Sequence, residues 1–373
     1  MIAALGLVAA VTPDAEAREL PATGLSYRID VDLDPQSRAV AGTAEIRWRN
    51  DWVHPVSAVP IHLYLNAFAH ERTTWVAGVP FRRFNVGEFL DVWEDPWGWI
   101  EPTSVRQRAG GEDFDASWRP ISPDDGNPFD RTLAFVSLPK PVPAGGELTL
   151  TVEWRSRMPI PIARTGCVGG YCLMAQWFPK LAVLEHWKDS EGAKGPGHPP
   201  WALRQFHGLT EFYSDFADYD VTITVPEGHL VGATGRAQDT PKPVEGASGK
   251  VSLRHVQRAV HDFAWVVGPD LAEATFPYTP AARGAVPVSV RYIVPRGLEH
   301  QIPRLRGAVE ASLDTLGRRV GPYPYDVLTV IGPPAHGGRT GGMEYPTLIT
   351  SVVADERWDR WPWHEVLLPE LVA

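Results

Sequence analysis

The feature that most constrains the fold is an alternation of apolar and polar residues that begins at Tyr27. Every second residue from Tyr27 to Leu33 is apolar, and after a Pro-Gln-Ser turn the pattern returns over Ala44–Arg49. Successive side chains of a β-strand point to opposite faces, so such segments have one apolar and one polar face. The pattern predicts antiparallel strands that pack on one side only.

Similar segments continue to Val267 and are separated by turn-rich stretches such as Pro141–Gly146 and Asp239–Gly249. Many short strands between turns indicate two curved sheets packed together. The sequence therefore predicts a mostly β domain, a saddle or sandwich, over residues 18–282. Its further strands are expected at Ile61–Leu65, Leu133–Leu138, Leu148–Trp154, Tyr219–Val225, Val251–His255 and Phe263–Val267.

The pattern changes near Pro280–Gly284, where a second domain is predicted over residues 283–373. Apolar residues recur at helical spacing from Ile302 to Val320, and Gly321-Pro322 ends the helix. Strands are expected before and after this helix, which is the order of an α/β domain. They are Val286–Val294, Asp326–Ile331 and Pro346–Val353, and Trp363–Ala373 is expected to start another helix.

Between Trp75 and Pro128 the alternation is lost, and the segment holds five tryptophans among Pro, Gly and Asp. Such a long connection is either a functional loop or a decorated insertion. The tryptophans either capture a ligand or pack onto the sheet, and packing is the simpler reading.

The first 17 residues resemble a signal peptide. Ile2–Val11 is an apolar run too short to span a bilayer, and Ala15-Glu16-Ala17 fits the small-x-small rule for cleavage. No Lys or Arg precedes the run, which departs from the usual leader. We expect export to the periplasm or outside the cell, and no transmembrane span.

Composition excludes several classes of protein. Hydrophobic residues are 44% and charged residues 21% of the 373 residues, which is typical of a globular protein. A net charge of −10 argues against nucleic acid as a partner, because phosphate contacts need a basic surface. The negative charge serves either solubility or a cleft for cationic substrates.

The chain has two cysteines, Cys167 and Cys172, on either side of Val-Gly-Gly-Tyr. They either close a small disulfide loop in an oxidising compartment or are two unrelated core residues. Two thiols without a matching pair make a poor metal site.

The segment most informative about function is Gly337–Pro346, whose glycines allow a backbone to approach a ligand closely. An extended edge here can pair with a peptide main chain. A single carboxylate, Glu344, lies on that edge, and a free ammonium group is the natural partner of such an acid. From the residues alone, a solvated glutamate on a glycine-rich hairpin is the favoured explanation of the segment.

The segment Gly341-Gly342-Met343-Glu344-Tyr345 resembles the Gly-x-Met-Glu-Asn exopeptidase motif of the M1 (gluzincin) zinc aminopeptidases, with Tyr-Pro in place of Asn. Other segments similar to that family follow in the expected order and cover nearly all of the chain after Leu20. They are Ser26–Asn50, Gln176–Leu181, Glu211–Val225, Gly232–Gly235, Asp262–Trp265 and Gly321–Tyr325.

The resemblance implies a β-saddle domain followed by the beginning of a thermolysin-like catalytic domain. It implies peptides with a free amino terminus as substrates, with Glu344 binding the α-amino group. Gly341 and Gly342 would line the scissile peptide on an edge that also carries Met343 and Tyr345. It also places Gln176 at the first subsite, although the spacing around it departs from the family.

Hydrolysis in that family uses zinc held by a His-Glu-x-x-His helix and a downstream Glu. Neither candidate in this sequence has the second histidine: His364-Glu365 is followed by Leu368, and His70-Glu71 by Thr74. No zinc ligand is therefore predicted in this chain, and the resemblance places the zinc helix just beyond Ala373.

Three hypotheses follow. The first is that the chain is the N-terminal part of an exported metallo-aminopeptidase that removes amino-terminal residues from peptides, and is inactive without the zinc half of the site. The second is a non-catalytic scaffold of the same fold that binds peptides or partner proteins. The third is a carbohydrate- or surface-binding β-sandwich in which the motif arises by chance, and the features of the second domain argue against it.

Overall fold

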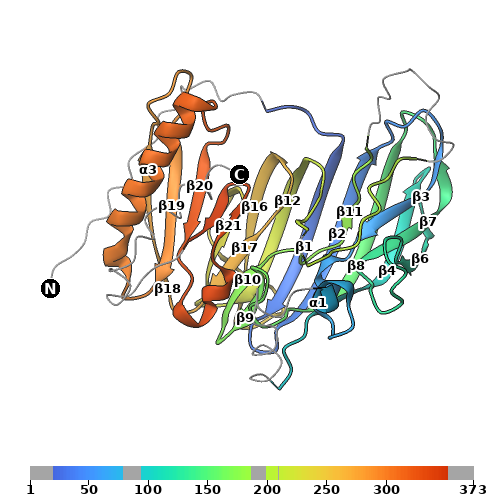
Figure 1. Ribbon diagram of the computed structural model, residues 1–373, viewed down its shortest axis with the longest axis horizontal. Helices are drawn as coiled ribbons and strands as arrows, with labels where there is room; N and C mark the ends of the chain where they lie inside the picture. The colour runs from blue at the N-terminus through green and yellow to red at the C-terminus, as the bar shows by residue number, and fades with distance from the viewer. Residues whose placement is uncertain (1–19, 79–93, 186–198, 209, 352–373) are drawn as a thin grey trace.

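The computed structural model describes residues 20–78, 94–185, 199–208 and 210–351. Their sheets form a row, with helix α3 (Ile302–Arg319) at one end and a small sheet of β3, β6 and β7 at the other (Figure 1). The predicted leader, the segment Trp363–Ala373 and His364 lie outside the described residues. Within the described ranges, no helix has the length and apolar character needed to cross a membrane.

The largest sheet contains the alternating segments from which the fold was predicted. In β1, buried residues alternate strictly with more exposed ones, and β1 pairs antiparallel with β2 from Leu25↔Trp48 to Asp34↔Ala39. The order in this sheet is β14-β16-β12-β1-β2-β8-β4-β5, with β15 beside β16. The strands are β1 (Leu25–Asp34), β2 (Ala39–Arg49), β4 (Trp99–Ala109), β5 (Glu112–Asp115), β8 (Glu147–Arg157), β12 (Ala217–Pro226), β14 (Arg236–Ala237), β15 (Lys242–Pro243) and β16 (Lys250–Val260).

Two four-stranded sheets complete the β domain. One has the order β13-β17-β10-β9, with β9 (Gly166–Val168), β10 (Tyr171–Met174), β13 (Leu230–Ala233) and β17 (Trp265–Gly268). The other has the order β11-β3-β7-β6, with β3 (Val56–His62), β6 (Ser117–Ile121), β7 (Leu133–Val142) and β11 (Lys180–Leu181). The mostly β character predicted from the alternation is confirmed.

The second part of the chain is a five-stranded sheet in the order β18-β19-β20-β22-β21. The predicted helix is confirmed as α3, which packs its apolar side, including Leu305 and Val309, against one face of the sheet. The strands are β18 (Leu271–Tyr278), β19 (Val288–Pro295), β20 (Val327–Ile331), β21 (Met343–Tyr345) and β22 (Leu348–Thr350). The 3-10 helices η2 (Glu299–Gln301) and η3 (Ala335–Thr340) lie before α3 and before β21.

The two parts are closely joined. A Cβ at Gly232 of β13 would lie 2.2 Å from Cδ1 of Ile293 of β19, so the absence of a side chain at Gly232 gives the Ile293 side chain its place against β13. The Tyr325 hydroxyl donates to the Ala259 carbonyl over 2.8 Å, and the Gly235 amide donates to the Thr347 hydroxyl over 2.7 Å. The five-stranded sheet is therefore fixed directly onto the β domain.

Some local predictions were wrong. The predicted strand Ile61–Leu65 is the end of β3 followed by η1 (Tyr64–Phe68), where the backbone turns and the Asn66 amide donates to the Leu63 carbonyl over 2.9 Å. The segment Trp75–Pro128 is not one irregular connection, because it contains β4, β5 and β6 after α1 (Thr74–Gly78). Trp75, Trp97 and Trp118 pack against the core as expected, whereas Trp99 is 38% exposed. Trp93 lies outside the described residues.

The predicted boundary at residues 282 and 283 stays a prediction. The five-stranded sheet takes its first strand, β18, from Leu271–Tyr278, which is upstream of that boundary.

Candidate functional site

The glycine-rich motif forms the edge strand of the five-stranded sheet. Strand β21 pairs antiparallel with β22, from Met343↔Thr350 to Tyr345↔Leu348, and no other described strand pairs with it. The outer backbone groups of such a strand remain available to an added strand. The edge predicted for a peptide main chain is thus an edge in the described part of the fold.

The glycines bring the chain onto this edge. Gly341 is extended with φ −76° and ψ 164°, whereas Gly342 has φ +74°, a conformation that favours glycine. The Gly342 amide donates to the Thr350 carbonyl over 3.1 Å, and the Met343 amide donates to the Thr350 hydroxyl over 3.0 Å. Both bonds hold the start of β21 against β22. The other side of β21 has no described strand beside it.

Glu344 is the middle residue of this edge and is half-buried. It lies opposite Ile349, a residue of the apolar cluster under α3, whereas Met343 and Tyr345 face the β domain. Among the described residues, none forms a hydrogen bond or an ion pair with the Glu344 carboxylate. A half-buried carboxylate without a partner is an available acceptor for a cationic group.

Tyr345 connects the edge to the β domain. Its side chain is buried and its hydroxyl has no hydrogen-bond partner in the described structure. Burial raises the pKa of the Tyr345 hydroxyl well above its ordinary value, the charge of Asp262 raises it further, and Arg164 opposes the shift. The hydroxyl therefore stays protonated and lies within the electrostatic field of Asp262 and Arg164.

Asp262 belongs to a buried polar network that includes Gln176. The Gln176 amide nitrogen donates to Asp262 over 2.7 Å, and its carbonyl oxygen accepts from Lys180 Nζ over 2.8 Å. Lys180 Nζ lies 2.6 Å from the other Asp262 oxygen. Burial lowers the pKa of Lys180, and the Asp262 carboxylate opposes that shift.

Gln176 is thus held inside the protein, 1% exposed, with both ends of its amide hydrogen-bonded. Its backbone has φ +57°, a sparsely populated conformation for a residue with a side chain. Both ends of the Gln176 amide are therefore already hydrogen-bonded, to Asp262 and to Lys180. That Gln176 contacts the first residue of a substrate stays a prediction.

A second ion pair lies within electrostatic range of Tyr345. Arg164 Nη1 is 3.6 Å from the Glu211 carboxylate, and both charges act on the Tyr345 hydroxyl. Arg164 and the preceding Ala163 have positive φ angles of 65° and 44°. Sequence reasoning missed Arg164, Glu211 and Asp262 as neighbours of the motif. Arg164 lay outside the segments with family resemblance, and Glu211 and Asp262 stood in such segments without a role.

A zinc site would need several His, Cys, Asp or Glu side chains close together. No group of three or more His, Cys, Asp or Glu side chains among them could hold a metal ion. His70 and Glu71 precede Thr74, whose hydroxyl donates to Asp125 over 2.7 Å. The described residues therefore do not by themselves supply a zinc site.

Comparison with solved structures identifies proteins of the same fold. The M1 zinc metallopeptidase from Deinococcus radiodurans matches with a TM-score of 0.56 and 19% identity, over 93% of this chain and 63% of that chain. Two mutant M1 zinc metallopeptidases match with a TM-score of 0.56 and 18% identity, over 93% of this chain and 64% of theirs. One is a two-domain enzyme bound to L-arginine, and the other is the Deinococcus radiodurans enzyme bound to a Tyr-Ser-Ala substrate.

No protein-family model and no curated protein matches the chain. The likeness to the solved structures shows a shared fold, that of the M1 zinc metallopeptidases, and this chain spans about 63% of the length of the first of them.

Proposed function

We propose that this chain is the substrate-recognition part of an M1-like zinc aminopeptidase, and that β21 binds the amino-terminal end of a peptide. In this proposal the peptide adds to the free side of β21 as a strand. Gly341 and Gly342 allow its backbone to approach, Met343 and Tyr345 hold the edge on the β domain, and Glu344 accepts the ammonium group.

The observation that carries the proposal is the unpartnered Glu344 carboxylate on an edge strand. A carboxylate in the described core, Asp262, is satisfied by Lys180 and Gln176, whereas Glu344 has no described partner. Binding of a charged amine to such a group is worth about 1.5–3 kcal/mol. That free energy corresponds to about 10- to 100-fold in affinity.

Calorimetric titration with the tripeptide Tyr-Ser-Ala tests this role. Glu344→Gln keeps the shape of the side chain and removes its charge, so we expect it to weaken binding about 10- to 100-fold. Glu112→Gln is the control, because Glu112 is an exposed residue of β5 at the far edge of the largest sheet. Equal affinities of wild type and Glu344→Gln for the peptide would show that Glu344 does not bind its ammonium group.

We propose further that the chain as given holds no complete zinc site, so that it recognises peptides without cleaving them. Incubation with Tyr-Ser-Ala and Zn²⁺, followed by mass spectrometry, should give no free tyrosine. Release of tyrosine would show that the chain already holds a complete zinc site.

Export is also proposed, and the disulfide between Cys167 and Cys172 supports it, because such bonds persist in oxidising compartments. Fusion of residues 1–25 to alkaline phosphatase, which folds only after export, should give an active enzyme in a bacterial host. An inactive fusion protein retained in the cytoplasm would contradict this part of the proposal.

A further inference from the structure

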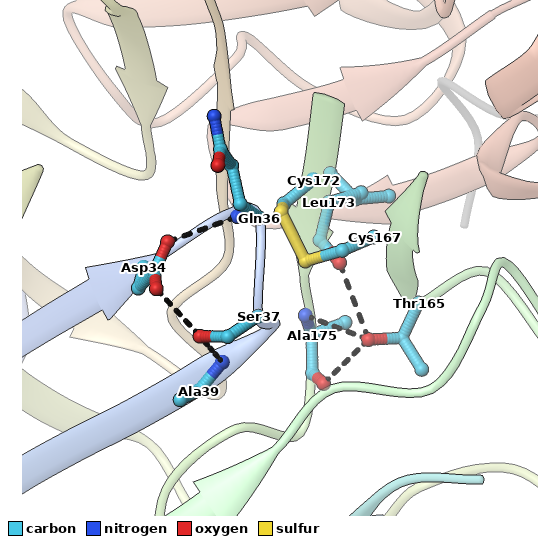
Figure 2. Close-up of a disulfide and its surroundings, with 9 residues drawn as sticks. All are labelled: Asp34, Gln36, Ser37, Ala39, Thr165, Cys167, Cys172, Leu173 and Ala175. Carbon is cyan, nitrogen blue, oxygen red and sulfur yellow. Dashed lines mark hydrogen bonds between the residues drawn. A yellow bond between two sulfur atoms is a disulfide. The ribbon is translucent and has the colours of Figure 1, made fainter. Parts of the chain in front are cut away.

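The disulfide-bonded hairpin of β9 and β10 is a part of the β domain that packs against the five-stranded sheet, near the proposed substrate edge β21. Its two-residue turn is Gly169-Gly170, with φ +58° and +84°, as a tight hairpin turn requires. Cys167 and Cys172 are directly opposite each other across the strands and are joined by the disulfide (Figure 2).

The hairpin is also fixed at its base. The Thr165 hydroxyl donates to the Ala175 carbonyl over 2.9 Å and accepts from the Ala175 amide over 3.2 Å (Figure 2). Strand β10 pairs further with β17, from Cys172↔Val267 to Met174↔Trp265. A short hairpin is thus held at its base, through its disulfide and by a neighbouring strand.

The two faces of β10 pack against different parts of the molecule. Cys172 and Met174 belong to the core of the β domain. Tyr171 and Leu173 point the other way, into the apolar cluster that also contains Tyr345. The bonds that hold the hairpin therefore also hold the Tyr171 side chain against the five-stranded sheet.

Tyr171 contacts the segment that leads into the motif. Its buried hydroxyl lies 3.2 Å from the Thr340 hydroxyl, which donates to the Gly337 carbonyl over 2.7 Å. A Cβ at Gly337 would lie 2.7 Å from the Tyr171 ring, and the His336 ring meets that ring edge-on with 6.5 Å between centroids. The ring thus packs directly against η3, whose next residue is Gly341.

We propose that Tyr171 is a positioning residue for the substrate edge, and that the Cys167–Cys172 hairpin holds it in place. This inference rests on the proposed role of Glu344. Tyr171 fixes η3, η3 fixes the path of Gly341 and Gly342, and that path sets where Glu344 meets the ammonium group of the peptide. Tyr171 itself is buried and does not contact the peptide.

The test compares Tyr171→Ala with Tyr171→Phe by titration with Tyr-Ser-Ala and with its N-acetylated form. Tyr171→Ala should lower the affinity for the free-amine peptide about tenfold and leave that for the acetylated peptide nearly unchanged, because Glu344 is displaced. Tyr171→Phe keeps the ring over Gly337 and should restore most of the preference for the free amine.

Hydrogen exchange measured without peptide provides a second readout. In Tyr171→Ala, amides of residues 335–345 should exchange faster, while those of β1 and β2 keep wild-type rates. The double variant Cys167→Ala, Cys172→Ala should change the same segment in the same direction. Wild-type exchange and wild-type preference for the free amine in Tyr171→Ala would overturn the inference.

A second pair of variants serves if Tyr171→Ala does not fold. Gly337→Ala introduces a Cβ against the Tyr171 ring, whereas a Cβ at Gly338 meets nothing within 4 Å. The preference for the free amine should be lost in Gly337→Ala and kept in Gly338→Ala, and equal behaviour of the two variants would overturn the inference.

The positioning role and the proposed function can fail separately. If Glu344→Gln binds like wild type, the proposed function itself fails. A large effect of Glu344→Gln with none from Tyr171→Ala rejects only the positioning role.

Discussion

Two carboxylates in this protein have opposite surroundings. Asp262 is buried and is satisfied by Lys180 at 2.6 Å, by the Gln176 amide at 2.7 Å and by the Phe263 amide at 2.7 Å. Glu344 is half-buried on an edge strand and has no hydrogen-bonding or ionic partner in the described part of the chain. Asp262 is therefore a structural group, and Glu344 is open to a ligand.

The difference follows from the cost of burying charge. A buried carboxylate is tolerated only when a cation and hydrogen bonds surround it, and Asp262 has both. At the edge of the five-stranded sheet, solvent can still reach Glu344, so the protein need not supply a partner. The comparison separates a group on which folding is expected to depend from one on which the proposed peptide binding depends, and the predictions below test that separation.

The largest effect is expected for Asp262→Ala, which leaves the Lys180 charge buried without its partner. The free energy of unfolding should fall by about 3–5 kcal/mol. Glu344→Ala breaks no described polar contact and should change the free energy of unfolding by less than about 0.5 kcal/mol. Urea denaturation of both variants measures the difference, and similar losses from the two substitutions would contradict the comparison.

A smaller effect is expected at His62, a buried neutral group that has no partner at either ring nitrogen. Burial, and then the charge of Lys180, lower the pKa of His62 to about 3. Because the unfolded chain takes up a proton near pH 6.5 and the folded chain does not, stability is complete above pH 6.5 and is lost as the pH falls. Between pH 7 and pH 5 the loss is about 2 kcal/mol for this histidine.

Replacing His62 by Phe keeps a ring beside Tyr64, on which His62 stacks with 4.5 Å between centroids. Urea denaturation of His62→Phe at the two pH values should show a loss smaller by about 2 kcal/mol than in wild type. His54→Gln, at an exposed position, should lose as much as wild type. An unchanged loss in His62→Phe would mean that His62 is not the neutral buried group described.

A smaller loss of stability than at Asp262 or His62 is expected at Gly342. Alanine at φ +74° is strained, so Gly342→Ala should lower the free energy of unfolding by about 1 kcal/mol. Because the strain lies next to Met343 and Glu344, peptide affinity should fall as well. Gly338→Ala is the matched control, and a Gly342→Ala variant that binds and unfolds like it would show that the conformation at Gly342 is not needed.

Local patterns were sufficient to predict much of the fold. The alternation from Tyr27 to Arg49 predicted β1 and β2, and the helical spacing from Ile302 predicted α3 almost to its last residue. Both signals lie within a single element, where the period of buried residues determines its type. The disulfide was left open, because the spacing of Cys167 and Cys172 fits a hairpin and a pair of core residues equally well.

The site was only partly predictable, because its neighbours come together through long-range pairing. Gln176 and Asp262 are 86 residues apart in sequence, and nothing in either segment indicates their hydrogen bond. The edge position of β21 depends on β22 lying between it and β20, which is a property of the whole sheet. For the same reason, no local pattern showed that β18 joins the five-stranded sheet.

A double-mutant cycle tests the central claim most directly. It measures the affinities of wild type and Glu344→Gln for Tyr-Ser-Ala and for its N-acetylated form, which lacks the ammonium group. If Glu344 accepts that group, the two changes are coupled by about 1.5–3 kcal/mol, and Glu344→Gln no longer distinguishes the two peptides. Additive effects, with a coupling free energy near zero, would contradict the account.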